Sequence, residues 1–156
     1  MLKPALLYKE ELEKLLIEIW YDEFYKYYTF DSYSSNVEIY SNNYHQNQFV
    51  SVDKNNNVIG FISYNIDRNV PSAKSLGVIN FDKIKGTNNK VLFGKDLVQA
   101  IDDIFFKFKF SKLEFAVAIG NPIRKNYLKL IKKYNGRVIG TRIKSVRLIN
   151  GELCDV

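Results

Sequence analysis

The clearest candidate for a chemical site lies in residues 75–126. The sequence there predicts a strand, a polar loop, the start of a helix that contains Gly94, a second strand, and an Asn-Pro pair that opens another helix. A helix N-terminus attracts anions because its backbone N–H groups are free and its dipole is positive there. We therefore expect this segment to bind a phosphate group at the helix start, with the rest of the ligand beside the two strands.

The helix at Gly94 has the strongest pattern in the chain. Its apolar residues recur at helical spacing on one face, and charged residues occupy the other. The apolar residues are Phe93, Leu97, Ala100, Ile101, Ile104, Phe105 and Phe108.

The next two elements frame the second half of the segment. Residues 113–119 alternate as a strand, in which two alanines leave room for a close neighbour. Asn121 can cap the following helix, and Pro122 suits its first position. The Asn-Gly pair at 135–136 is typical of a helix end.

The remaining elements lie at the two ends of the chain. An amphipathic helix follows Pro4 and is expected to break near residues 20–22. Strands at 49–52 and 58–65 flank a hairpin turn. Near the C-terminus we expect a long strand at 138–149, a type I′ turn at Asn150-Gly151, and a strand at 152–156 that pairs back.

This order predicts an α/β (α+β) fold in one domain, residues 1–156. Strands joined by a helix should be parallel with a right-handed crossover, and hairpins at each end make the other pairs antiparallel. The expected product is a mixed sheet with a central parallel strand pair, antiparallel hairpins and helices on both faces. The terminal strands are candidate edges for pairing with a second copy of the chain.

Composition limits the classes of function. The chain has 156 residues, is 46% hydrophobic and has a mean hydropathy of −0.23, as expected of a globular domain with a real core. No apolar run approaches the roughly 18 residues of a membrane span, and no basic and apolar leader opens the chain. We therefore expect a cytoplasmic protein with no membrane partner.

Cysteine and histidine are too few for several chemistries. Cys154 and His45 are single residues of their types, so the chain can form no internal disulfide and no ordinary His/Cys zinc site. The chain also has no Gly-x-Ser-x-Gly elbow to supply the serine of a Ser-His-Asp triad. We expect neither a metal site nor a hydrolase.

The net charge of +6 suits an anionic partner. A nucleic acid is one alternative, because the C-terminal part carries a basic run. It consists of Arg124, Lys125, Lys129, Lys132, Lys133, Arg137, Arg142, Lys144 and Arg147. No helix-turn-helix, zinc-finger or RNP pattern accompanies the run, which favours a solvated face over a nucleic-acid site.

The order of elements and these motifs resemble the GNAT (GCN5-related N-acetyltransferase) superfamily over nearly the whole chain. The resemblance implies acetyl-CoA as co-substrate, with its pantetheine arm on strand 76–81 and its pyrophosphate in a loop of pattern Gln/Arg-x-x-Gly-x-Gly/Ala. That loop aligns with residues 89–94, where Gly94 matches, Asn89 replaces Gln/Arg and Leu92 replaces the middle glycine. The implied cofactor residues are Val78, Ile79, Asn80, Phe81, Asn89, Lys90, Val91, Leu92, Phe93, Gly94 and Lys95. N–H groups of residues 91–95 are expected to face the anion.

The resemblance also implies roles for two residues after the second strand. Asn121 matches the family's asparagine at the splay between the parallel strands. Tyr127 is the candidate acid that protonates the departing CoA thiolate, although it follows Asn121 by six positions instead of the usual seven or eight. A core tyrosine is the alternative for Tyr127.

The implied reaction is direct attack of a primary amine on the thioester. Glu114, Asp82 and Glu38 are candidate bases, and N–H groups of strand 79–81 are candidate oxyanion donors. An inactive GNAT-like binding module remains an alternative. The sequence does not identify the acceptor. Aromatic and acidic residues of the N-terminal part are expected to receive it, namely Trp20, Tyr21, Phe24, Tyr25, Tyr27, Tyr28, Tyr33, Tyr40, Asp22, Glu23 and Asp31; closing the core is their alternative role.

Overall fold

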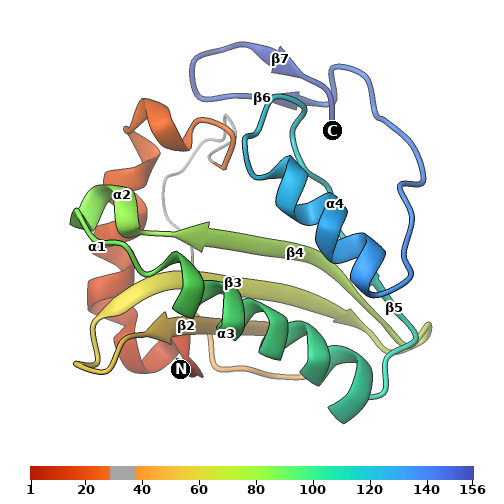
Figure 1. Ribbon diagram of the computed structural model, residues 1–156, viewed down its shortest axis with the longest axis horizontal. Coiled ribbons are helices and arrows are strands. Elements are labelled where there is room, and N and C mark those ends of the chain that lie inside the picture. The colour runs from red at the N-terminus through yellow and green to blue at the C-terminus, as the bar shows by residue number, and fades with distance from the viewer. Residues whose placement is uncertain (29–37) are drawn as a thin grey trace. The chain divides into compact units, whose positions relative to one another are not determined.

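A computed structural model of the chain describes residues 1–28 and 38–156 (Figure 1). These residues form two compact units. The first contains residues 1–18 and 38–115, and the second contains residues 19–28 and 116–156. No helix of the described part is long and apolar enough to span a membrane.

A five-stranded sheet forms the framework of the first unit, in the order β1-β2-β3-β4-β5. All neighbours are antiparallel except β4 and β5, which are parallel. The predicted mixed sheet with one parallel pair is therefore confirmed, but the pair lies at the β5 edge of this sheet and not at its centre. The strands are β1 (Leu2–Pro4), β2 (Gln46–Val52), β3 (Val58–Asp67), β4 (Ser72–Asn80) and β5 (Lys112–Glu114).

The predicted hairpin between β2 and β3 is confirmed. Asp53 organises its turn, because its side-chain Oδ1 accepts hydrogen bonds from the N–H groups of Asn55 and Asn57 at 2.8 and 2.9 Å. Asn56 takes a positive φ of 67°, which asparagine tolerates better than most residues. The hydrogen bonds from Asn57 hold the pKa of Asp53 below its ordinary value.

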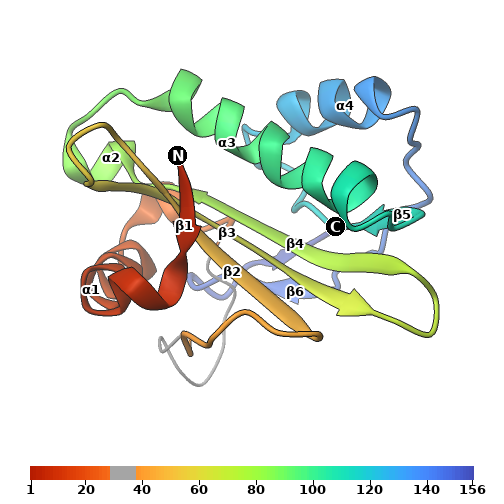
Figure 2. The same ribbon diagram turned by 90° about the horizontal axis from the view of Figure 1, so that it is seen from below.

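Helices α1 (Lys9–Trp20) and α3 (Lys90–Asp102) lie on opposite faces of the sheet (Figure 2), as predicted. A 3-10 turn, η1 (Ala5–Tyr8), leads into α1, and a π-helical turn, η3 (Asp103–Lys107), continues α3. The Phe93 ring fixes the start of α3 on the sheet. It lies so close to Gly60 of β3 that a Cβ there would be 2.2 Å from the ring.

Two elements of the first unit were not predicted. Strand β1 pairs with β2 through Leu2 and Ser51, and it contains a proline, which an edge strand tolerates. Helix α2 (Asp82–Lys85) is a single turn that ends at Gly86, whose φ of 62° suits glycine.

The second unit contains helix α4 (Arg124–Lys133), a 3-10 turn η2 (Glu23–Tyr25) and a small antiparallel sheet of β6 (Val146–Arg147) and β7 (Leu153–Cys154). Helix α4 ends as predicted, because Asn135 takes a φ of 55° and the Gly136 N–H donates to the Ile131 carbonyl at 2.8 Å. Ala118, Leu148 and Cys154, the last of them in β7, form a buried apolar cluster in this unit.

Three predictions for these segments are wrong. The strand at 113–119 ends at Glu114, because the chain turns away and the Ile119 N–H donates to the Asp155 carbonyl at 2.8 Å. The strand at 138–149 is regular only in β6, since residues 138–141 have no strand beside them among the described residues. The turn at Asn150-Gly151 is not type I′, because Gly151 alone of the pair has a positive φ.

Candidate functional site

A β-bulge in β4 marks the point where the parallel pair ends. Ser63 of β3 pairs with Gly77, and Asn65 pairs with Lys74, so two β4 residues lie opposite one β3 residue. Ser75 is in the bulge with a φ of 56°, a left-handed conformation that is uncommon for serine. The pairing of β4 with β5 stops at Lys74 and Glu114, directly before this residue. Bulges bend a strand and end its pairing, so β5 leaves the edge of β4 uncovered beyond Ser75.

The register of β4 decides which of its backbone groups face the uncovered edge. The Phe81 N–H donates to the Ile59 carbonyl at 3.0 Å, which makes Gly60 and Asn80 a non-hydrogen-bonded pair. The backbone N–H and C=O groups of successive β4 residues therefore point alternately toward β3 and away from it. Those of Ile79 point toward β3. Val78 points the other way, and its N–H and C=O have no partner among the described residues.

This alternation corrects two of the three predicted oxyanion donors, residues 79 and 81, whereas the backbone of Asn80 points away from β3 like that of Val78. Phe81 cannot supply its N–H, because Ile59 already accepts that hydrogen bond, and Ile79 faces the neighbouring strand. Val78 presents the donor on the uncovered edge. A count of residues could not reveal this, because the phase of the alternation depends on the bulge.

A buried carboxylate organises the loop between β4 and α3. Asp82 is 4% exposed. Its Oδ1 accepts from the Thr87 hydroxyl at 2.6 Å, and its two oxygens accept from the Asn89 N–H at 2.8 and 2.9 Å. The Asn80 side chain in turn accepts from the Asp82 N–H at 3.1 Å. The end of β4 and the start of α3 are therefore tied together through one side chain.

The first turn of α3 presents three N–H groups without a partner. The Asn89 side chain does not cap the helix, and the Phe93 N–H donates to the Asn89 carbonyl at 2.9 Å. The N–H groups of residues 90, 91 and 92 lie at the start of the helix, where no helical carbonyl is available four residues earlier. Within the described part of the chain, nothing bonds the N–H groups of Lys90, Val91 and Leu92.

The predicted donor set of residues 91–95 is therefore wrong at its C-terminal end. Phe93 is bonded within the helix, and Gly94 and Lys95 follow it inside α3. Gly94 is nonetheless open. A Cβ built on it would meet no atom within 4 Å, so neither packing nor backbone conformation requires glycine there.

Asn121 lies in the second unit and is buried. Its Oδ1 accepts from the Ile123 N–H at 3.1 Å, and its side chain hydrogen-bonds Tyr28. Because α4 begins at Arg124 with Ile123 preceding it, Asn121 forms a turn before the helix and is not its cap. The contact with Tyr28 was not predicted, and no sequence signal joins these two residues.

Tyr127 lies on the inner side of α4 and is 8% exposed. Burial raises its pKa well above the ordinary value, and nearby Tyr28 adds to the effect. Burial also raises the pKa of Tyr28, whereas its hydrogen bond with Asn121 opposes that rise. Both hydroxyls are therefore protonated at neutral pH.

Two of the three candidate bases have their carboxylate oxygens engaged. Glu114 pairs with Lys112 at 2.7 Å, and this contact lowers its pKa. The oxygens of Asp82 are engaged in the loop described above. Glu38 is exposed. Among the described residues, no group of three His, Cys, Asp or Glu gathers as a metal site would require.

The predicted acceptor residues divide by burial. Tyr25 is buried, whereas Tyr21 and Phe24 are exposed. Glu23 pairs with Lys26 at 2.8 Å, and Asp22 accepts from the Phe24 N–H. Tyr33 and Asp31 lie outside the described residues.

Comparison with known proteins identifies the fold. No protein-family profile and no curated protein matches the chain. Solved structures of SpeG from Vibrio cholerae do match. A chimera of this spermidine N-acetyltransferase with hSSAT has a TM-score of 0.55 and 24% identity over 71% of this chain and 63% of that one. Mutant forms of the spermidine/spermine enzyme give 0.57 and 22% over the same shares.

A complex of the same SpeG enzyme with manganese ions matches with a TM-score of 0.55 and 22% identity, over 94% of this chain and 69% of that one. The chain spans 63% of the SpeG–hSSAT chimera and of the mutant forms, which is less than two thirds of their length. At these identities the likeness concerns the fold. The chain has the fold of the GNAT superfamily.

Proposed function

We propose that this chain is an N-acetyltransferase that moves an acetyl group from acetyl-CoA to a primary amine by direct attack. One observation in the first unit carries the proposal. Among the described residues, the pairing of β5 with β4 stops before the Ser75 bulge, and the chain after β4 leads to an α3 N-terminus with three unbonded N–H groups. The pantetheine arm of CoA is extended and carries amides, and a diphosphate follows it. An open strand edge followed by a helix N-terminus suits these two parts in this order.

We assign the pantetheine arm to the end of β4. The arm contains amide groups that can pair with a strand edge as another strand would. Val78 supplies the N–H and C=O that point to that edge, and the same N–H can stabilise negative charge on the thioester oxygen during attack. The residues of this assignment are Val78, Ile79, Asn80 and Phe81.

We assign the diphosphate to the start of α3. The N–H groups of Lys90, Val91 and Leu92 and the helix dipole favour an anion there, and the ammonium groups of Lys90 and Lys95 add attraction. Asp82 holds Asn89, and with it the helix start, in place. The residues of this assignment are Asn89, Lys90, Val91, Leu92, Phe93, Gly94 and Lys95. Asn121, which lies in the second unit, stays a separate prediction as a cofactor-binding residue.

In the proposed reaction the neutral amine attacks the thioester carbonyl carbon. A C–N bond forms, the C–S bond breaks, the amine nitrogen loses a proton and the CoA thiolate gains one. Tyr127 is the proposed proton donor, and its raised pKa keeps the proton on the hydroxyl until the thiolate leaves. Positioning of the two reactants is expected to supply much of the rate.

The experiment is a thiol-release assay with acetyl-CoA and a panel of primary amines. Spermidine comes first, because the solved structures with this fold carry that substrate in their names. Amine-dependent release of CoA thiol is the expected result. If acetyl-CoA raises the melting temperature and no amine releases thiol, the chain is instead an inactive binding module of the same fold.

A further inference from the structure

The charge of the chain is concentrated in its C-terminal part. Residues 116–156 contain nine Lys or Arg against two Asp or Glu, a net +7, whereas residues 1–115 contain fourteen against fifteen, a net −1. The whole positive charge of the chain therefore belongs to these 41 residues. A general bias of the genome toward lysine would have spread the positive charge along the whole chain.

These cations are exposed, and most of them form no ion pair. Lys125, Lys129 and Lys132 recur at spacings of three and four, so they share the outer face of α4, opposite buried Tyr127. Within the described residues, eight of the nine basic side chains make no salt bridge. They are Arg124, Lys125, Lys129, Lys132, Lys133, Arg137, Arg142 and Lys144, which we call the basic face.

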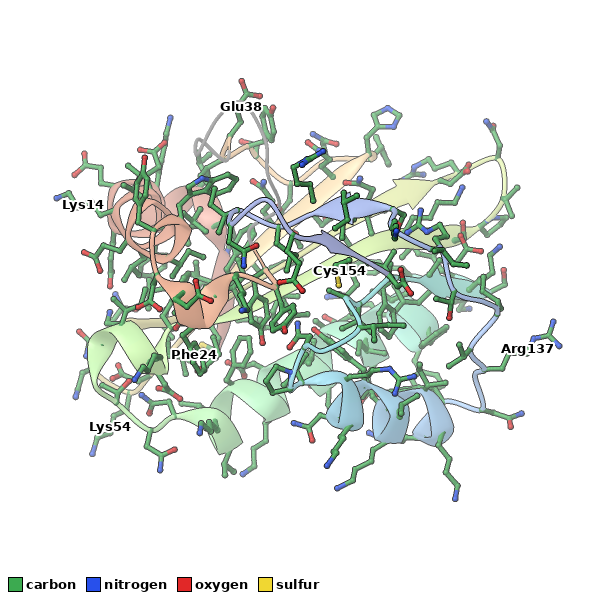
Figure 3. The ribbon with its side chains drawn as sticks, turned by 90° about the horizontal axis from the view of Figure 1, so that it is seen from above. Lys14, Phe24, Glu38, Lys54, Arg137 and Cys154 are labelled. Carbon is green, nitrogen blue, oxygen red and sulfur yellow. The ribbon has the colours of Figure 1, made fainter. Side chains whose placement is uncertain are left out.

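The extended segment after α4 adds three exposed cations, Arg137, Arg142 and Lys144. Arg137 projects outward from the ribbon (Figure 3), and Arg142 is fixed by two backbone hydrogen bonds with Val156, at 2.7 and 3.1 Å. The basic face therefore combines a helix stripe with an anchored segment of the same unit. From Lys125 to Lys133 the stripe is about 12 Å long, which is the axial length of about seven charges on duplex DNA.

We propose that the basic face binds the phosphodiester backbone of duplex DNA without reading its sequence, independently of acetyl transfer. Single-strand binding requires exposed aromatic platforms for the bases, and Tyr127 of α4 is buried while Tyr134 is half-buried. A membrane surface would use Val138, Ile139 and Ile143, which are 59%, 84% and 76% exposed. The cations outnumber these aliphatic residues, and Tyr127 of α4 is buried near Tyr28 of the same unit, so the charge argument favours DNA.

The test is the anisotropy of a labelled 20-base-pair duplex at several salt concentrations. The key variant is Lys125→Gln, Lys129→Gln, Lys132→Gln and Lys133→Gln together. The matched control carries Lys14→Gln, Lys54→Gln, Lys107→Gln and Lys109→Gln, which removes the same charge from positions elsewhere in the chain. The expected Kd of the wild type is about 10⁻⁶–10⁻⁴ M, with the steep salt dependence of backbone binding.

The key variant should raise Kd at least about tenfold and lower the salt slope by about 0.9 for each phosphate that it no longer neutralises, while the control changes Kd far less. Equal losses of affinity in both variants, or no wild-type binding at about 50 mM salt, would overturn the proposal. A tenfold preference for single-stranded RNA would also overturn it. A fourth outcome would overturn it as well. In that outcome the protein binds vesicles containing phosphatidylserine but not DNA, and the double variant Ile139→Ser with Ile143→Ser abolishes the vesicle binding.

Discussion

The Asp82 carboxylate accepts the Asn89 N–H through both oxygens, at 2.8 and 2.9 Å. This contact supplies a cap that the Asn89 side chain does not make, because a carboxylate at a helix N-terminus bonds a free N–H and complements the dipole. It also leaves the N–H groups of the next three residues available. In the proposed enzyme, Asp82 is thus a positioning residue for the diphosphate.

Substitution of Asp82 should separate geometry from charge. Asp82→Ala removes the hydrogen bonds from Asn89 and Thr87 and should lower stability by about 1–2 kcal/mol and weaken CoA binding by about tenfold. Asp82→Asn keeps an acceptor and removes a negative charge near the phosphates, so CoA should bind as tightly as to the wild type or a few times more tightly. Calorimetric titration with CoA and with pantetheine checks this, since pantetheine has no diphosphate and its affinity should not change.

Asp67→Asn is the matched control for these variants, because Asp67 also accepts backbone N–H groups but at the turn before β4. It should leave the affinity for CoA unchanged. Equal CoA affinity in Asp82→Ala and the wild type, measured below both melting temperatures, would show that Asp82 acts on stability alone. Absence of wild-type binding would instead contradict the proposed function itself.

Gly94 offers a second test of the diphosphate assignment. Since a Cβ there meets nothing within 4 Å, Gly94→Ala should stabilise the free protein by up to about 1 kcal/mol through helix propensity. Gly94→Glu should leave the free protein folded and abolish the rise in melting temperature caused by acetyl-CoA, because it places a carboxylate near the phosphates. An unchanged rise in Gly94→Glu would mean that the diphosphate lies elsewhere.

Much of the fold was predictable because local patterns agree with the final contacts. The helical stripe around Phe93 and the hairpin turn at Asp53 are signals of this kind. Residues 138–141 carry strand-forming residues but have no strand beside them among the described residues, so propensity alone misled. The bulge at Ser75 lacks the usual glycine, and the Asp82 side chain joins residues five and seven positions away within an irregular loop. Those two features decide which N–H groups are available, and sequence spacing could not reveal them.

The backbone of Ser75 predicts a stability effect that is independent of any ligand. A left-handed conformation costs a non-glycine residue about 1 kcal/mol, so Ser75→Gly should raise the free energy of unfolding by about that amount in urea titrations. Asn65→Gly on the partner strand is the control and should lower it by about 0.5–1 kcal/mol, because β3 is extended there. A loss of stability in Ser75→Gly would remove the bulge as described.

Tyr64 predicts how stability depends on alkaline pH. Burial raises its pKa to about 12, against 10 in the unfolded chain. The folded state therefore holds this proton more tightly, so the contribution is complete below pH 10 and is lost as the pH rises toward 12. The loss should reach about 2 kcal/mol near pH 12. Tyr64→Phe should show a correspondingly flatter decline between pH 9 and 12 in urea unfolding, and parallel curves for the two proteins would contradict the assignment.

Tyr127 tests the proposed proton transfer. Tyr127→Phe removes the hydroxyl and keeps the ring that packs in the second unit, so kcat for CoA release should fall by about 10²-fold or more while the affinity for acetyl-CoA changes little. Because the raised pKa keeps the wild-type hydroxyl protonated above pH 10, the alkaline limb that belongs to this acid should lie above pH 10 and be missing in the variant. Tyr28→Phe is the control, since it removes the neighbouring hydroxyl that bonds Asn121. Wild-type turnover in Tyr127→Phe, with the loss seen only in Tyr28→Phe, would assign the proton to Tyr28 instead.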